Sequence, residues 1–188
     1  MKLYRFLPLA ALLPLGAVAQ DLDYTFVELN YVDTELDAGP LDVGGDGLGV
    51  SGSLSVTDSV FLFANYGTQD YDFDVDSTGY DVGAGMRWGL KPRLDLIGEV
   101  AWAYTEVEVN GFSVDDDGLG LGLGLRGRAG EDFELQGGVR YVDYEDSETY
   151  VSLRGRWHFS SMWAAGLGLD FDDDASIWSL GLRAQFGN

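Results

Sequence analysis

The sequence has no cysteine, one histidine and only eleven basic residues against thirty-two acidic ones. Without cysteine the chain cannot form a disulfide, bind a metal through a thiolate or carry a lipid on a thiol. The acidic excess gives a formal net charge of −21, and such a charge repels nucleic acids and other polyanions at long range. We therefore expect no nucleic-acid partner.

Beyond its N-terminus the chain also lacks any long apolar run, which excludes a transmembrane helix. The first nineteen residues combine a basic start at Lys2 and Arg5, the apolar run FLPLAALLPLG and the small-residue site Ala17-Val18-Ala19. This three-part pattern predicts a signal peptide, and its apolar run is too short for a membrane anchor. We expect export, a cleaved signal peptide at residues 1–19 and one domain at residues 20–188. The mature domain would carry nine basic residues and a net charge of −23.

What the chain does have is alternation with a period of two. Ten segments of nine to twelve residues are apolar or aromatic at every second position: 24–32, 47–56, 60–68, 79–89, 94–105, 118–128, 133–143, 149–159, 163–172 and 175–186. A tilted transmembrane β-strand needs about 9 to 11 residues. The pattern predicts an all-β fold, a transmembrane antiparallel up-and-down β-barrel of ten strands, with eight strands as the alternative.

The connections between these segments alternate between two kinds. Short turns at 57–58, 90–93, 130–132 and 160–161 alternate with longer acidic stretches that include 33–46, 69–78 and 106–117. Outer-membrane barrels have short periplasmic turns and longer external loops. We therefore expect both termini on the periplasmic side and acidic loops outside. Asn110-Gly111, inside one of these stretches, is a two-residue hairpin signal.

Aromatic residues lie on the same parity as the aliphatic ones and close to the ends of the segments. They are Tyr66, Tyr80, Trp88, Trp102, Tyr104, Phe133, Tyr141, Trp157, Phe159, Trp163, Phe171, Trp178 and Phe186. Four segments carry two of them eight residues apart, a height of about 20 Å in a tilted strand, which is close to the spacing of two aromatic girdles. The competing interpretation is a secreted β-sandwich, whose apolar face would instead point into a core.

The last segment contains SLGLRAQF, which resembles the C-terminal insertion signal of bacterial outer-membrane barrels, although Gly187 and Asn188 follow its final aromatic residue. Together with YTFVELNYV and FLFANYG, it makes the chain similar to the small outer-membrane barrel proteins of the OmpA/OmpX-like kind. The resemblance implies residence in the outer membrane of a Gram-negative bacterium and insertion by the barrel-assembly machinery. It also implies contact with outer-membrane lipid and lipopolysaccharide.

The opposite parity would line the lumen, and it holds seven arginines and six carboxylates together with glycines and His158. The charged residues are Glu28, Asp81, Arg87, Asp95, Glu99, Arg126, Arg128, Glu134, Arg140, Arg154, Arg156, Asp170 and Arg183. They form either the lining of a pore or an ion-pair lattice that fills a narrow barrel. Carrying the register down from Asn110-Gly111 sets Asp95 opposite Arg126. The short turns set Arg87 opposite Asp95 and Arg128 opposite Glu134, each within two residues. These oppositely charged neighbours favour the lattice.

The acidic stretches contain aspartates that could hold divalent cations loosely: Asp70, Asp72, Asp74, Asp76, Asp115, Asp116, Asp117, Asp172, Asp173 and Asp174. No stretch has the pattern of a calcium-binding loop, since Val75 stands where its glycine should be. We therefore expect no specific metal site and no cofactor beyond such loosely bound cations. The alternative is a solvated acidic rim without bound cations.

The single histidine, His158, is placed near a periplasmic turn. The outer-membrane proteases and lipid A hydrolases that this chain could resemble depend on a histidine near the outer surface, so we expect no enzyme. The leading hypothesis is a non-enzymatic barrel that serves envelope structure or surface interaction, with an external partner that no residue identifies. The alternative is a narrow outer-membrane channel that prefers cations.

Overall fold

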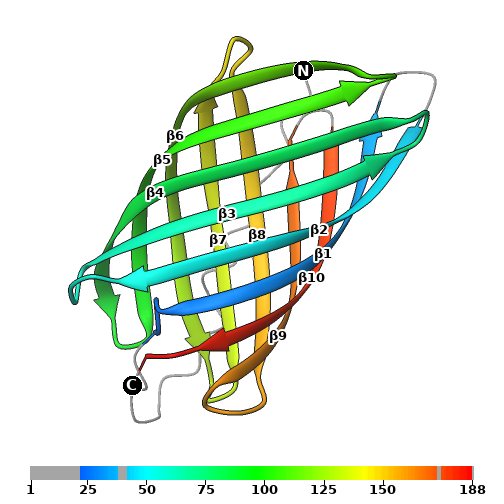
Figure 1. Cartoon of the computed structure of the whole chain (residues 1–188). Coiled ribbons are helices and arrows are strands. Elements are labelled where there is room, and N and C mark those ends of the chain that lie inside the picture. The colour runs from blue at the N-terminus through cyan, green and yellow to red at the C-terminus, as the bar shows by residue number, and fades with distance from the viewer. Residues whose placement is uncertain (1–21, 38–41, 173–174, 188) are drawn as a thin grey trace, which may run out of the picture.

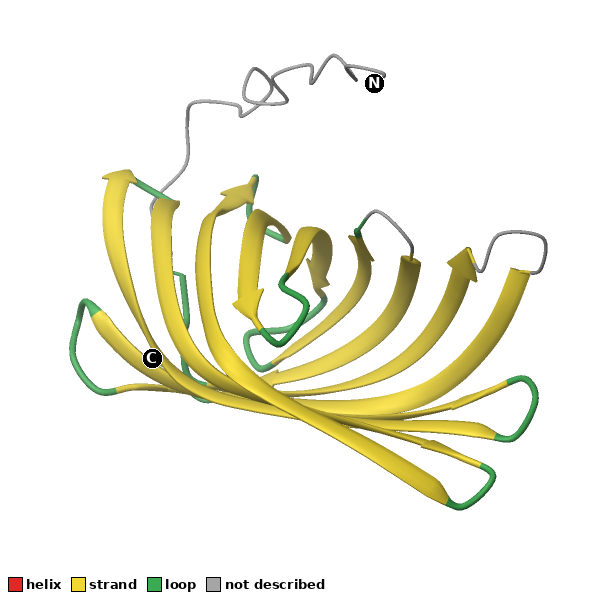
Figure 2. Ribbon diagram, turned by 90° about the horizontal axis from the view of Figure 1, so that it is seen from above, coloured by secondary structure: helices red, strands yellow, loops and turns green. Residues whose placement is uncertain are grey.

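The computed structural model describes residues 22–37, 42–172 and 175–187. In this part of the chain ten antiparallel strands close into a barrel, in which each strand pairs with its sequence neighbours and β1 pairs with β10 (Figures 1 and 2). The strands are β1 (Phe26–Asp37), β2 (Asp42–Ser55), β3 (Val60–Tyr71), β4 (Val75–Lys91), β5 (Leu94–Val109), β6 (Phe112–Ala129), β7 (Phe133–Asp143), β8 (Glu148–His158), β9 (Trp163–Phe171) and β10 (Ala175–Gln185).

The ten-strand prediction is confirmed, and the alternative of eight strands is wrong. Among the described residues no helix is long and apolar enough to cross a membrane. The proposed signal peptide, residues 1–19, lies outside the described residues. We use "periplasmic" for the end of the barrel that holds Leu22 and Gly187, and "external" for the opposite end, as the sequence predicts.

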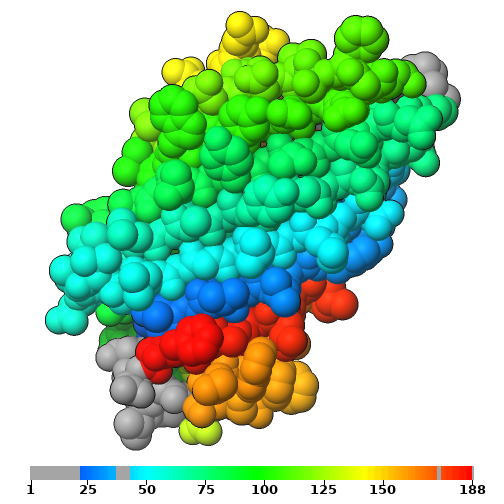
Figure 3. Space-filling model, viewed as in Figure 1, coloured from blue at the N-terminus to red at the C-terminus, as the bar shows by residue number. Residues whose placement is uncertain are grey.

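The outer wall of the barrel is apolar. Leu119, Leu121, Leu123 and Leu125 on β6 alternate with inward residues and are 44 to 62% exposed. The outer side chains of β1 to β6 form one continuous surface (Figure 3). A water-soluble sandwich would bury such residues between its sheets, whereas a transmembrane barrel turns them toward lipid. In the alternating segments, the apolar side chains therefore face outward and the other side chains face the lumen.

Aromatic residues mark both edges of this wall. Near the external end Tyr66 lies opposite Tyr80, and Tyr80 lies opposite Tyr104, with the last two rings stacked at 4.9 Å between centroids. We call these three residues the tyrosine row. Near the periplasmic end Phe133 lies opposite Trp157. Two aromatic edges around an apolar band are typical of barrels in the outer membrane.

The predicted long external loops at 69–78 and 106–117 are instead strand hairpins. β3 and β4 are joined by a turn at residues 72–74, and β5 and β6 by Asn110-Gly111 alone. Both of these residues have positive φ, 51° and 81°, which is the type I′ turn that this dipeptide predicts. The loop prediction was wrong because apolar or aromatic residues alternate with polar ones in both hairpins, at Tyr71 and Val75 in one and at Val107, Val109, Phe112 and Val114 in the other, a pattern that also pairs well in water.

The external edge of the barrel is uneven. β4, β5 and β6 are 17, 16 and 18 residues long, whereas β7, β8 and β9 are 11, 11 and 9 residues long. β7 pairs with β6 only up to Leu119, so the part of β6 from Phe112 to Gly118 rises beyond its neighbour. At the external end, the wall formed by β4, β5 and β6 therefore extends further than the wall formed by β7, β8 and β9.

Inside the barrel, glycines make room for large side chains from neighbouring strands. The ring of Phe61 lies over Gly85, where a Cβ would overlap it. A Cβ on Gly120 would lie 3.0 Å from the Arg140 guanidinium, and one on Gly122 would lie 3.2 Å from the Glu99 carboxylate. The alternating glycines of β6 are thus the surface on which charged lumen side chains lie.

Candidate functional site

The periplasmic half of the lumen is filled by buried charges that converge on two carboxylates. Glu134 on β7 is fully buried and accepts hydrogen bonds from Nε and Nη2 of Arg126, at 2.9 and 3.0 Å. It also accepts one from Arg156 Nη1 at 3.1 Å. The planar guanidinium suits this two-point contact, which offsets part of the cost of burying the charges.

Glu28 on β1 is the second centre of this network. Its Oε2 accepts hydrogen bonds from Nε of Arg156, at 3.1 Å, and from Nε of Arg183. Arg183 Nη1 lies 3.7 Å from Glu134, and His158 Nε2 lies 3.3 Å from the same carboxylate. We call Glu28, Arg126, Glu134, Arg156 and Arg183 the ion-pair lattice. Its members come from five strands, so it ties opposite walls of the barrel together.

The segment before β1 closes the periplasmic mouth below the lattice. Tyr24 is buried, donates a hydrogen bond to Asp95 Oδ2 at 3.0 Å, and lies under the Arg126 guanidinium, 4.5 Å from the ring centroid. Arg87 donates to the Leu22 carbonyl at 3.3 Å. Cation–π contacts of this kind are favourable when water is excluded. Together with the lattice, Leu22 and Tyr24 fill this end of the lumen.

Sequence reasoning missed the aromatic residues inside the barrel. Tyr24, just before β1, and Phe26, the first residue of β1, stand on the inward parity, and Arg183 lies over the Phe26 ring at 3.5 Å from its centroid. Phe61 and Phe63 on β3 are buried as well. The signal was present, since Phe61 and Phe63 stand on the parity opposite to that of Tyr66, the outward aromatic residue of the same strand. An aromatic residue was read only as a girdle residue.

The predicted registers are confirmed at two places and shifted at a third. Asp95 lies opposite Arg126, and Arg128 lies opposite Glu134. Gly89 rather than Arg87 lies opposite Asp95, a shift of two residues. Nevertheless Arg87 Nη1 reaches Asp95 Oδ2 at 3.5 Å.

Opposite positions do not by themselves identify the ion pairs. The Arg126 guanidinium contacts Glu134 and not Asp95, the residue across from it. Arg128, which faces Glu134 in the sheet, donates instead to the Glu131 carbonyl at 3.1 Å. An arginine side chain is long enough to reach a diagonal neighbour, so register fixes the set of candidates rather than the partner.

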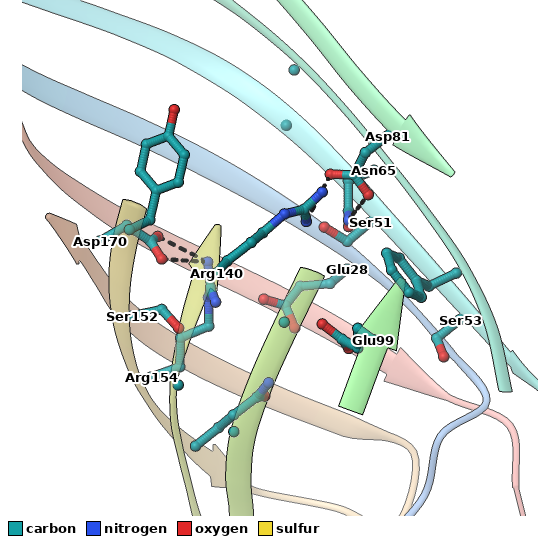
Figure 4. Close-up of a pocket in the computed structure, with 18 of the residues that line it drawn as sticks. Glu28, Ser51, Ser53, Asn65, Asp81, Glu99, Arg140, Ser152, Arg154 and Asp170 are labelled. Atoms are coloured by element: carbon teal, nitrogen blue, oxygen red, sulfur yellow. Dashed lines mark hydrogen bonds and ion pairs between the residues drawn. The ribbon is translucent and has the colours of Figure 1, made fainter. Parts of the chain in front are cut away.

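Above the periplasmic closure the lumen holds a cavity of about 520 Å³, whose floor includes Tyr24, Phe26 and the lattice residues Glu28, Arg126, Arg156 and Arg183. Figure 4 shows part of its lining. We call this cavity the vestibule. Two ion pairs cross its wall: Arg140 with Asp81 at 3.2 Å, and Arg154 with Asp170, which accepts two bonds at 2.8 and 3.1 Å. Asn65 Nδ2 also donates to Asp81 at 2.8 Å. Each of these charged groups is therefore held by a partner.

Glu99 on β5 differs from the other charged residues of the vestibule. It has no basic group within 4 Å among the described residues, although Arg140 is only two strands away, beyond Gly122. The Arg140 guanidinium is directed toward Asp81 instead (Figure 4). Near the mouth, burial raises the pKa of the Tyr144 hydroxyl in the β7–β8 turn. That hydroxyl is therefore a neutral hydrogen-bonding group.

The profile of the family described as "Outer membrane protein beta-barrel domain" matches residues 6–186. The chain belongs to this outer-membrane β-barrel family. It is therefore a transmembrane barrel of the outer membrane, and its apolar wall faces lipid.

Solved structures similar to this outer-membrane barrel include the KdgM porin, with 11% identity and a TM-score of 0.49 over 85% of this chain and 99% of that chain. Neisserial surface protein A has 11% identity and a TM-score of 0.47, over 86% and 96%. Ail, the attachment invasion locus protein of Yersinia pestis, has 15% identity and a TM-score of 0.46, over 87% and 99%. Identities this low bear on the fold alone. No curated protein matches the sequence.

The aspartates suggested for cation binding are spread around the external rim of this outer-membrane barrel. Asp70, Asp76 and Asp115 to Asp117 lie in strands, Asp72 and Asp74 lie in a turn, and Asp172 follows β9. Asp173 and Asp174 lie outside the described residues. Within the described ranges no three acidic or histidine side chains are grouped as a metal site would require. Several cap turns instead, as Asp116 does for the Glu145 amide at 3.0 Å.

Proposed function

We propose that this outer-membrane barrel is a non-enzymatic structural and surface protein, closed on its periplasmic side and presenting an acidic external rim. Its partners in this role are outer-membrane lipid and lipopolysaccharide, the barrel-assembly machinery during insertion, and a surface partner that the chain does not identify. Divalent cations held loosely by the rim would screen its charge near the lipid phosphates.

The observation that carries the proposal is the burial of the ion-pair lattice. Glu134 is 0% exposed and Arg126 is 2% exposed, and both lie above the mouth that Leu22 and Tyr24 fill. A conducting lumen needs a continuous path of water, and buried ion-pair contacts between facing strands oppose such a path. The only histidine, His158, is buried at this closed end, away from any substrate outside the cell, which supports the absence of catalysis.

Planar-bilayer recording of the refolded full chain tests this proposal. We expect no steady single-channel openings, whereas a double variant with Tyr24→Ala and Arg126→Ala should open a path and conduct. Insertion of both proteins is checked by protease resistance in the same bilayers. Steady openings of the unchanged protein would contradict the closed barrel.

A narrow cation-preferring channel is the second candidate, because the vestibule already provides half of a polar path lined by Asp81, Glu99 and Asp170. If the protein conducts, Asp81→Asn and Asp170→Asn should each reduce cation conductance, since carboxylate rings select cations. Asp58→Asn, at an exposed position of the β2–β3 turn and away from the vestibule, is the control. Unchanged conductance in the two vestibule variants would count against the channel.

A further inference from the structure

Above the lattice, the vestibule wall has three carboxylates and two arginines, while the lattice residues that also line the cavity are Glu28, Arg126, Arg156 and Arg183. The wall carries Asp81, Glu99 and Asp170 against Arg140 and Arg154, and both arginines are occupied by Asp81 and Asp170. Glu99 is the carboxylate without a counter-charge within 4 Å in the described part of the chain. An unpaired carboxylate in a partly enclosed space favours a bound cation more strongly than one in open water.

Both arginines of the vestibule wall are directed to carboxylates other than Glu99. Arg154 holds Asp170 through two hydrogen bonds, and Asp81 is bound by both Arg140 and Asn65. Glu99 lies against β6, where its Cβ and carboxylate are close to Gly122, and it lines the vestibule.

The surroundings of Glu99 suit an organic cation better than a metal ion. Metal ions of the calcium type need six to eight oxygens from several carboxylates, and the described residues form no such group. The vestibule is lined by uncharged hydrogen-bonding side chains as well, namely Asn30, Ser51, Ser152 and Ser179. A volume of about 520 Å³ lies within the range of small-molecule sites.

We propose that the vestibule binds a small polyhydroxylated primary amine, with the ammonium group on Glu99 and the hydroxyl groups on the neutral polar side chains. The acidic rim raises the local concentration of cations at the mouth. Below, the ion-pair lattice closes the floor, so the site holds its ligand. This role goes beyond the structural one and does not depend on whether the barrel conducts.

Glucosamine is the probe, and N-acetylglucosamine is its neutral counterpart with the same ring. Titration calorimetry at pH 7 on the refolded full chain in detergent micelles should show saturable binding of glucosamine and at least tenfold weaker binding of N-acetylglucosamine. Glu99→Gln should weaken glucosamine binding at least tenfold. Glu108→Gln, the same change on the exposed external end of β5, should leave the affinity within twofold.

If Glu99→Gln fails to fold, amide chemical shifts of the unchanged protein provide an independent test. Amide chemical shifts of Gly122 and Arg140 should move on saturation with glucosamine, while those of Glu108 should not. Absence of saturable binding, equal affinity for both sugars, equal affinity of Glu99→Gln, or shifts confined to the rim would each overturn the proposal.

Discussion

Three buried arginines share the carboxylate of Glu134, and this one residue shows why the lumen has nearly equal numbers of positive and negative groups. Removing one partner from a buried network leaves the others without a counter-charge in a medium of low dielectric constant. Loss of one lattice residue should for this reason lower the free energy of unfolding by more than the small net contribution of the intact lattice would suggest.

Glu134→Gln should lower the free energy of unfolding by about 3 to 5 kcal/mol, the cost typical of breaking a buried ion pair. Urea titration of the protein in lipid vesicles, followed by tryptophan fluorescence, measures the change. Glu131→Gln, three residues earlier in an exposed turn, is the control and should have little effect. Equal stability of the two variants would argue against a lattice centred on Glu134.

The lumen glycines make a second prediction at the residue scale. A methyl group at Gly85 would overlap the Phe61 ring, whereas one at Gly52 would have nothing within 4 Å. Gly85→Ala should therefore destabilise the barrel by about 1 to 3 kcal/mol through overpacking, and Gly52→Ala should not. The same urea titration compares them. Equal stability of the Gly85→Ala and Gly52→Ala variants would contradict the packing of the Phe61 ring over Gly85.

At the scale of the element, β6 passes through two environments in one continuous strand. Leu123 is 62% exposed and Val114 is 74% exposed, yet Leu123 lies within the apolar band and Val114 lies beyond the tyrosine row. Leu123→Arg should cost about 2 to 4 kcal/mol at mid-membrane depth, and Val114→Arg should cost close to nothing. Equal costs in refolding titrations would contradict the position of the membrane.

The external hairpins carry like charges directly across from one another. Asp46 lies opposite Asp70, Asp70 opposite Asp76, and Asp76 opposite Glu108. Opposed like charges weaken a strand pair, and salt screens the repulsion. Asp70→Asn, or 0.5 M salt, should therefore slow amide exchange in the ends of β3 and β4 about twofold to fivefold. Asp58→Asn at the periplasmic turn should not, and an equal effect there would point to general charge rather than these pairs.

Over the whole molecule, the strand number, the outward parity and the charged lining followed from the sequence because alternation is a local property. Register was also predictable wherever a tight turn fixed it, as Asn110-Gly111 did for Asp95 and Arg126. The choice of Glu134 by Arg126, and the entry of Tyr24 into the mouth, depend on where long side chains end in three dimensions. The alternation of residues along a strand does not determine where long side chains end. For the same reason, the sequence did not predict that Glu99 lacks an ion-pair partner.

The difference in height between β4–β6 and β7–β9 makes the external mouth of the barrel asymmetric. The seven residues of β6 from Phe112 to Gly118, which extend beyond the pairing with β7, form a high wall on one side of the mouth, and the short β7–β8 turn forms a low wall on the other. A solute of the kind proposed for the vestibule would therefore enter most directly over the low wall, nearly parallel to the membrane surface. It would come from among the sugars and phosphates of the outer leaflet sooner than from bulk water.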